Sequence, residues 1–189
     1  MKKSNTLLKI VNLFFLVLGC FLFVHSLFPK ESRPSVFASD FVSIFDLVVG
    51  VFAYIAALFY LISGYKKDAA RYYKIFMTMV LITTVITAIN VMGNNKANLL
   101  TSTLIILLVV LTTIMATGKD IGKIKSYYIA IGVVFIQILL IVEMIVEFDT
   151  SFILFRDALL YSFCKLVLFV TAGLLVAGKY SDKDSRGAR

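Results

Sequence analysis

Six apolar runs, each close to the length of a membrane-crossing helix, are the feature that most constrains how this chain folds. They lie at residues 7–28, 41–63, 72–92, 99–117, 127–147 and 152–177. A helix rises 1.5 Å per residue, so about 20 apolar residues cross a hydrocarbon layer roughly 30 Å thick. The runs lack the alternating pattern of barrel strands, the other structure that can cross a bilayer. We therefore predict an all-α integral membrane protein with six transmembrane helices arranged as three antiparallel hairpins.

The composition supports this class and leaves no room for a second kind of domain. Of the 189 residues, 60% are hydrophobic and 16% are charged, a balance far from that of soluble domains. No polar stretch is long enough to form a separate soluble unit. We expect a single transmembrane domain that spans residues 1–189.

Residues typical of helix ends separate the runs. Side chains suited to N-caps come before three of them, at Asp40, Asn98 and Asp149. Three glycines that could form left-handed C-caps follow the second, fourth and sixth runs, at Gly64, Gly118 and Gly178. These residues predict where the helices begin and end.

The basic residues predict the orientation of the chain in the membrane. Fourteen lie on one side of the predicted spans, at residues 2, 3, 9, 66, 67, 71, 74, 119, 123, 125, 179, 183, 186 and 189. Four lie on the other side, at residues 30, 33, 96 and 156, and Lys165 lies within a span. Lys and Arg are enriched on the cytoplasmic side of membrane proteins, so both termini are expected in the cytoplasm.

The N-terminal part of the chain also contains weak signals for processing. Residues 17–20 resemble a lipoprotein cleavage box, and residues 36–38 resemble a signal-peptidase site. The apolar run continues past Cys20 and is longer than the apolar region of a signal peptide. We expect the first helix to remain in the protein.

Sequence motifs of enzymes and cofactor sites are absent. The chain has no HExxH, GxSxG, GxGxxG, phosphate-binding loop or CxxC motif, and it has one histidine. We expect no enzymatic activity, no metal site and no cofactor. The net charge of +8 follows from the membrane orientation and does not indicate nucleic-acid binding, which needs a basic face on a soluble module.

Three charged residues lie inside the predicted spans, where a charge costs about 2.5 to 3.5 kcal/mol. Asp46 and Glu143 each lie six residues inward from an acidic boundary residue, and Lys165 lies eight residues inward. At 1.5 Å per residue, their depths are roughly 9, 9 and 12 Å. A cluster of these three side chains is possible if the second, fifth and sixth helices are neighbours.

Two further patterns extend this candidate polar site. Asp157, Tyr161 and Lys165 are spaced by four residues and form one stripe on the sixth helix. Asp46 shares a helix face with small residues at positions 50, 53 and 57, which favour close helix packing. His25 lies near the same boundary and is a weaker candidate for the cluster or for a pH sensor.

Two interpretations of these charges remain open at this stage. They could line an outward-facing site for a small polar solute or an ion, or they could pair as structural contacts between helices. Independent residues near the interface are a third reading. We expect an accessory or interaction protein of a bacterial cell membrane, bound to a membrane protein partner or to a second copy. The alternative is a small-solute or ion transport module.

Overall fold

The chain is all-helical throughout the part that the structure, a computed structural model, describes. That part comprises residues 2–27, 41–62, 69–93, 98–117, 125–147 and 152–187. The helices are α1 (Lys2–Leu27), α2 (Phe41–Ile62), α3 (Ala69–Gly93), α4 (Leu99–Thr117), α5 (Ser126–Glu147) and α6 (Phe152–Gly187). Five of them, α2 to α6, are long and apolar enough to cross a membrane. The predicted helical class is therefore confirmed, and these five helices are consistent with a multi-pass membrane protein.

The first predicted span is a helix whose described apolar stretch is shorter. In α1 this stretch covers Ile10–Leu22, although the whole helix has 26 residues. A membrane crossing by α1 stays a prediction.

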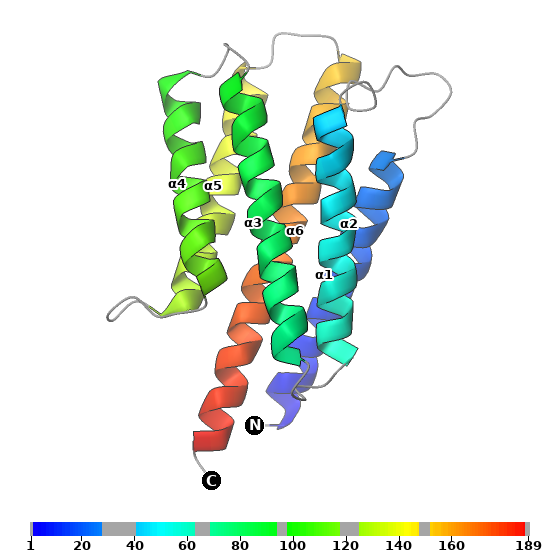
Figure 1. The fold of residues 1–189 in the computed structure, drawn as a ribbon, viewed down its shortest axis with the longest axis vertical. Coiled ribbons are helices and arrows are strands. Elements are labelled where there is room, and N and C mark those ends of the chain that lie inside the picture. The colour runs from blue at the N-terminus through cyan, green and yellow to red at the C-terminus, as the bar shows by residue number, and fades with distance from the viewer. Residues whose placement is uncertain are drawn as a thin grey trace.

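The six helices close into a ring. Each helix packs against the next one along the chain, α1 packs against α6, and α3 also contacts α6 across the bundle. In Figure 1 the helix axes run side by side, with α4 and α5 at one edge and α1 and α2 at the other. Helix α1 begins and α6 ends at the same end of the bundle (Figure 1).

The predicted helix boundaries agree with the structure within three residues except at the start of α1, which begins at Lys2 and not at residue 7, and at the end of α6. Asn98 is an N-cap as expected, because its Oδ1 accepts a hydrogen bond of 2.7 Å from the backbone N–H of Thr101. The expected end at Gly178 is wrong, since α6 continues to Gly187. One glycine inside a helix costs only about 1 kcal/mol, and no proline follows to stop it. The other proposed caps, at Asp40, Asp149, Gly64 and Gly118, lie outside the described residues.

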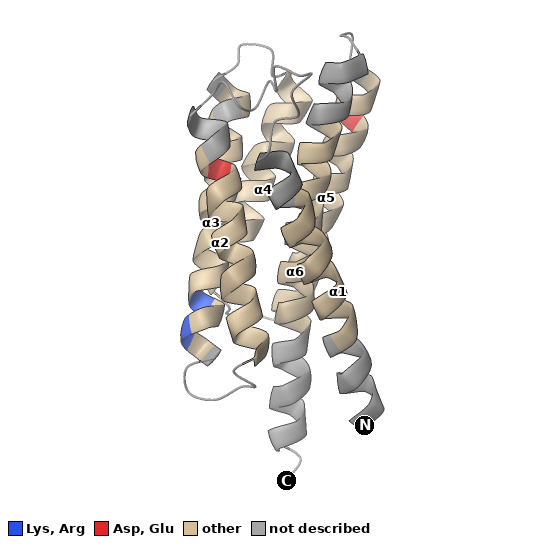
Figure 2. Ribbon diagram, turned by 90° about the vertical axis from the view of Figure 1, so that its right-hand side faces the viewer, with Lys and Arg blue, Asp and Glu red and all other residues tan. Residues whose placement is uncertain are grey.

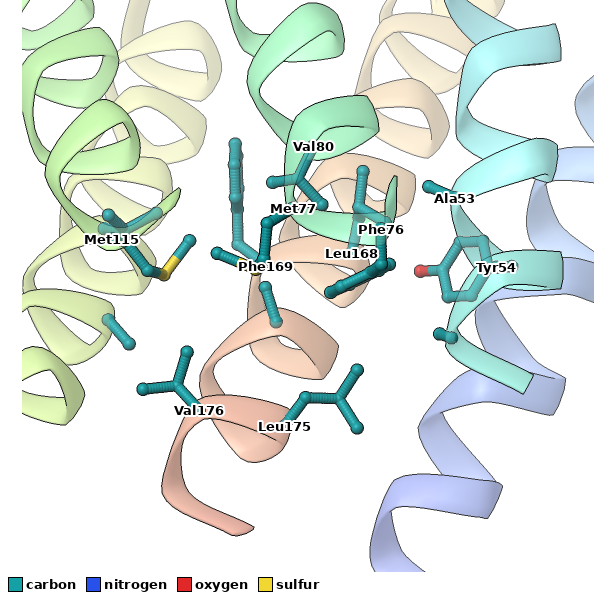
Figure 3. Close-up of a cluster of buried hydrophobic side chains, with 14 of the residues drawn as sticks. Ala53, Tyr54, Phe76, Met77, Val80, Met115, Leu168, Phe169, Leu175 and Val176 are labelled. Carbon is teal, nitrogen blue, oxygen red and sulfur yellow. The ribbon is translucent and has the colours of Figure 1, made fainter. Parts of the chain in front are cut away.

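Large side chains from several helices meet in the middle of the bundle. Figure 3 shows Tyr54 of α2, Phe76 and Met77 of α3 and Phe169 of α6, with Met115 reaching in from α4. All five are almost completely buried. Lipid tails are as apolar as these side chains, so inside a bilayer such a core stabilises through close packing rather than through exclusion of water.

The outer faces of the helices are apolar as well. Large hydrophobic residues such as Phe52, Phe59, Ile131 and Phe135 are about half exposed. The candidate spans of α2 and α6 are each 50% buried inside the bundle, whereas that of α4 is 22% buried. Among the five candidate spans, that of α4 therefore presents the largest share of its residues to whatever surrounds the bundle.

Candidate functional site

A buried ion pair joins α2 to α6. The Nζ atom of Lys165 lies 2.6 Å from Oδ1 of Asp46 and 2.5 Å from Oδ2. The side chains of Lys165 and Asp46 are 2% and 0% exposed. The sequence placed these two residues at similar depth, and the structure brings them into direct contact.

The Lys165 ammonium also contacts a third helix. An ammonium group has three donors, and the backbone carbonyl of Thr83 on α3 lies 3.5 Å from Nζ. Together with the two oxygens of Asp46, this carbonyl gives three acceptors. The pair is therefore linked to a third helix, which reduces the cost of burying its charges.

Tyr161 completes this buried network. Its hydroxyl donates a hydrogen bond to Oδ2 of Asp46, and its ring lies beneath the ammonium, with Nζ of Lys165 5.3 Å from the ring centroid. Tyr161 is four residues before Lys165 on α6, so the helix places both side chains on one face. We refer to Asp46, Tyr161, Lys165 and the Thr83 carbonyl as the Asp46–Lys165 network.

The small residues of α2 allow the helices to approach one another around this network. Ala53 and Ala57 are completely buried on the face that also carries Asp46. A face of alanines permits close packing of neighbouring helices. The predicted stripe of small residues beside Asp46 thus lies inside the bundle.

Glu143 lies apart from this network. It is on α5, and its Oε1 accepts a hydrogen bond of 2.6 Å from the hydroxyl of Thr101 on α4. Helix α5 packs against α4 and α6, so its carboxylate meets the start of α4 instead of α2. The expected cluster of three charges is corrected to a pair, with Glu143 elsewhere.

Figure 2 makes the separation visible. The red segments, which mark Asp and Glu residues, lie on opposite sides of the bundle. The acidic side chains in the described part are those of Asp46 and Glu143. The described Lys and Arg segments that are visible in blue lie toward the opposite end. Within the described residues, Oε2 of Glu143 has no hydrogen-bond partner.

Two of the sequence candidates lie where only the backbone is described. His25 belongs to α1 and Asp157 to α6, and their side chains lie outside the described part. Their participation in a polar site stays a prediction.

Sequence reasoning missed two partners of the charged residues. The Thr83 carbonyl is a backbone group, so no residue type signals it. Thr101 lies three residues after the N-cap Asn98, and its hydroxyl is also 2.9 Å from Oδ1 of Asn98. The position of Thr101 close after an N-cap residue was the available signal in the sequence. It indicated the start of a helix and gave no sign that Thr101 would be a hydrogen-bond partner of a distant carboxylate.

The geometry gives a closed, internally satisfied charge pair. Among the described residues, no group of three or more His, Cys, Asp or Glu side chains could hold a metal ion. Comparison of the chain with protein-family models, curated proteins and solved structures finds no match.

Proposed function

We propose that this chain is a non-enzymatic accessory or interaction protein of a cell membrane, in which the Asp46–Lys165 network has a structural role. The observation that supports this is the closure of the network. The two charged side chains are each at most 2% exposed, and they form an ion pair with each other. A binding site for a charged solute would instead present unpaired groups to a cavity.

The network suits a structural role because it specifies how three helices fit together. Apolar surfaces can slide past one another with little change in energy, whereas a buried charge tolerates few alternative partners. Removal of one member of such a pair is costly because the other remains buried and uncompensated. The network therefore fixes the position of α2 and α6 relative to α3.

An accessory protein of this kind would bind its partner through its outer surface. The described outer faces carry large apolar side chains, and helix association in lipid depends on close packing of complementary surfaces. We propose a membrane protein partner or a second copy as the bound protein. Helix α4 has the largest free share of its span and is the natural place for this contact.

The proposal includes the finer topology. We propose that the chain is one domain that crosses the membrane six times, as three antiparallel hairpins. We also propose that both termini lie in the cytoplasm of a bacterial cell. The excess of Lys and Arg on one side supports this orientation. Reporter fusions at residues 33 and 96, which should lie outside, and at residues 67 and 123, which should lie inside, test it.

Purification of the tagged chain from its native membrane in mild detergent tests the function. We expect a protein partner in fixed stoichiometry, identified by mass spectrometry. The double variant Asp46→Asn/Lys165→Met should retain the partner, because it removes both charges together and leaves the outer surface unchanged. Its monodisperse elution is the control for folding.

A transport function with an outward-facing polar site is the alternative, and the unpartnered Oε2 of Glu143 is the observation that favours it. That function predicts a bound small polar solute or ion, no stoichiometric protein partner, and loss of the solute in Glu143→Gln. A solute retained in Glu143→Gln would argue against a role for this carboxylate.

A further inference from the structure

A groove between α5 and α6 lies apart from the Asp46–Lys165 network and has no role in the proposed function. It has a volume of about 290 Å³. Its walls come from Tyr127, Ala130, Ile131 and Val134 on α5 and from Gly173 and Ala177 on α6, among others. Small residues at three of these positions leave space between two helices that pack against each other.

The position of the groove determines the kind of molecule that can fill it. All of its lining residues lie within the candidate spans Ser126–Val146 and Leu159–Ala177. At this depth the surrounding medium is lipid tails, and the lining is almost entirely apolar. A dry apolar cavity of about 150 Å³ holds benzene, so a groove of about 290 Å³ accommodates a longer segment of an acyl chain.

Two lysines of the sequence come two residues from lining residues at one end of the groove. Tyr127, which lines the groove, follows two residues after Lys125, whose side chain is exposed. Ala177, at the same end, comes two residues before Lys179. Tyrosine and lysine are typical of the level of lipid headgroups.

We propose that this groove binds one acyl chain of an anionic phospholipid, whose phosphate headgroup lies against Lys125. The charge at the groove's end favours this lipid over a zwitterionic one. It also disfavours a second copy as the occupant. Two copies that docked groove to groove would bring their Lys125 side chains close together, where like charges repel.

The absence of tryptophan from the chain makes a direct test available. Ile131→Trp places a single indole at the edge of the groove, since Ile131 lines it and is 61% exposed. Ile138→Trp is the matched control, seven residues further along α5, 41% exposed and not part of the lining. Full-length protein is reconstituted in phosphatidylcholine vesicles that contain brominated phosphatidylglycerol or brominated phosphatidylcholine, and quenching of the indole is measured.

We expect Ile131→Trp to report a preference of about fivefold for phosphatidylglycerol, the factor that corresponds to about 1 kcal/mol for one basic side chain at a membrane surface. Ile138→Trp should report a ratio close to one. Equal quenching by the two lipids at both positions would overturn the proposal.

Further substitutions in the Ile131→Trp background separate the two parts of the site. Lys125→Gln should reduce the ratio to one, whereas Arg71→Gln, at the start of α3, should leave it unchanged. Gly173→Leu should fill the groove and reduce quenching by both lipids. Gly173→Ala is its control, because the added Cβ would lie at an ordinary contact distance of 3.5 Å from Cβ of Ala130.

A preference that persists in Lys125→Gln would show that the headgroup contact is wrong. If Gly173→Leu leaves quenching unchanged but converts a dimer into a monomer, as measured by light scattering in detergent, the occupant is a second copy. Either result overturns the proposal.

Discussion

Asp46 and Glu143 are two acidic residues that the sequence predicts at similar depth in the membrane. Their surroundings in the folded chain are very different. Asp46 is completely buried and contacts Lys165 and Tyr161 of α6. Glu143 is partly exposed, and its hydrogen bond is to the hydroxyl of Thr101 on α4. The comparison shows that the role of a charged residue is determined by the side chains next to it and not by its depth in a membrane.

The difference extends to the two regions that contain these residues. The α2–α3–α6 region has a charge pair whose donors and acceptors are matched, and it forms much of the packed core (Figure 3). The α4–α5 region has one neutral donor for its carboxylate. We therefore expect substitutions in the first region to cost much more stability than equivalent substitutions in the second.

The substitution Lys165→Met should have the largest effect of those we consider. It leaves the Asp46 carboxylate buried without a counter-ion, which typically costs about 3 to 5 kcal/mol. The free energy of unfolding, measured by titration with a denaturing detergent in mixed micelles, should fall by about this amount. The control Asp46→Asn/Lys165→Met should recover most of the loss.

An equal loss in the single and double variants would mean that leaving the Asp46 carboxylate without its counter-ion costs nothing, so the ion pair would not stabilise this region. Such a result would remove the structural reason for the ion pair.

Gly19→Ala tests how closely α1 packs against α2. A Cβ atom at Gly19 would overlap the ring of Tyr54, which is 1% exposed and cannot move away freely. Overpacking of this kind costs about 1 to 3 kcal/mol. The same measurement on Gly132→Ala, where the nearest atom is the end of the Leu111 side chain at 3.3 Å, should show a smaller loss.

A loss of stability in Gly132→Ala as large as that in Gly19→Ala would mean that the α4–α5 contact is as rigid as the α1–α2 contact. The contrast between the two regions would then be limited to their charges.

Sequence reasoning predicted the helices well because their signal is local. A long apolar run between polar clusters indicates a membrane-crossing helix without any knowledge of its neighbours. The N-cap at Asn98 was found for the same reason, since it depends on residues that follow within one turn. The end of α6 was missed because Gly178 permits a helix end but does not require one.

The candidate site was predicted less completely because it depends on which helices are neighbours. Pairing of Asp46 with Lys165 was anticipated from their depth, and Tyr161 from its spacing to Lys165. The separation of Glu143 follows from the packing of α5 against α4, which no local pattern encodes. The Thr83 carbonyl belongs to the backbone and leaves no trace in residue type.

Asn98→Ala should have a moderate effect that is confined to the α4–α5 region. It removes the acceptor for the Thr101 N–H, 2.7 Å away, and the loss of an N-cap typically costs about 1 kcal/mol. Asn98→Asp, which keeps an oxygen acceptor, is the control and should be close to neutral. Hydrogen exchange of the first turn of α4 should increase in the alanine variant only, and an equal increase in α2 would contradict local action.

Glu143→Gln should have the smallest effect, within about 0.5 kcal/mol, which is usual for residues outside a packed network. The glutamine carbonyl can still accept the hydrogen bond from Thr101, so the contact between α4 and α5 is retained. The same detergent titration measures this change beside that of Lys165→Met, with Thr101→Val as the variant that removes the donor. If Glu143→Gln instead costs several kcal/mol, its carboxylate is coupled to a basic partner, and the contrast between Asp46 and Glu143 is wrong. A small effect would show that two carboxylates at similar depth can differ in stability contribution by several kcal/mol, because only one of them has an opposite charge in contact.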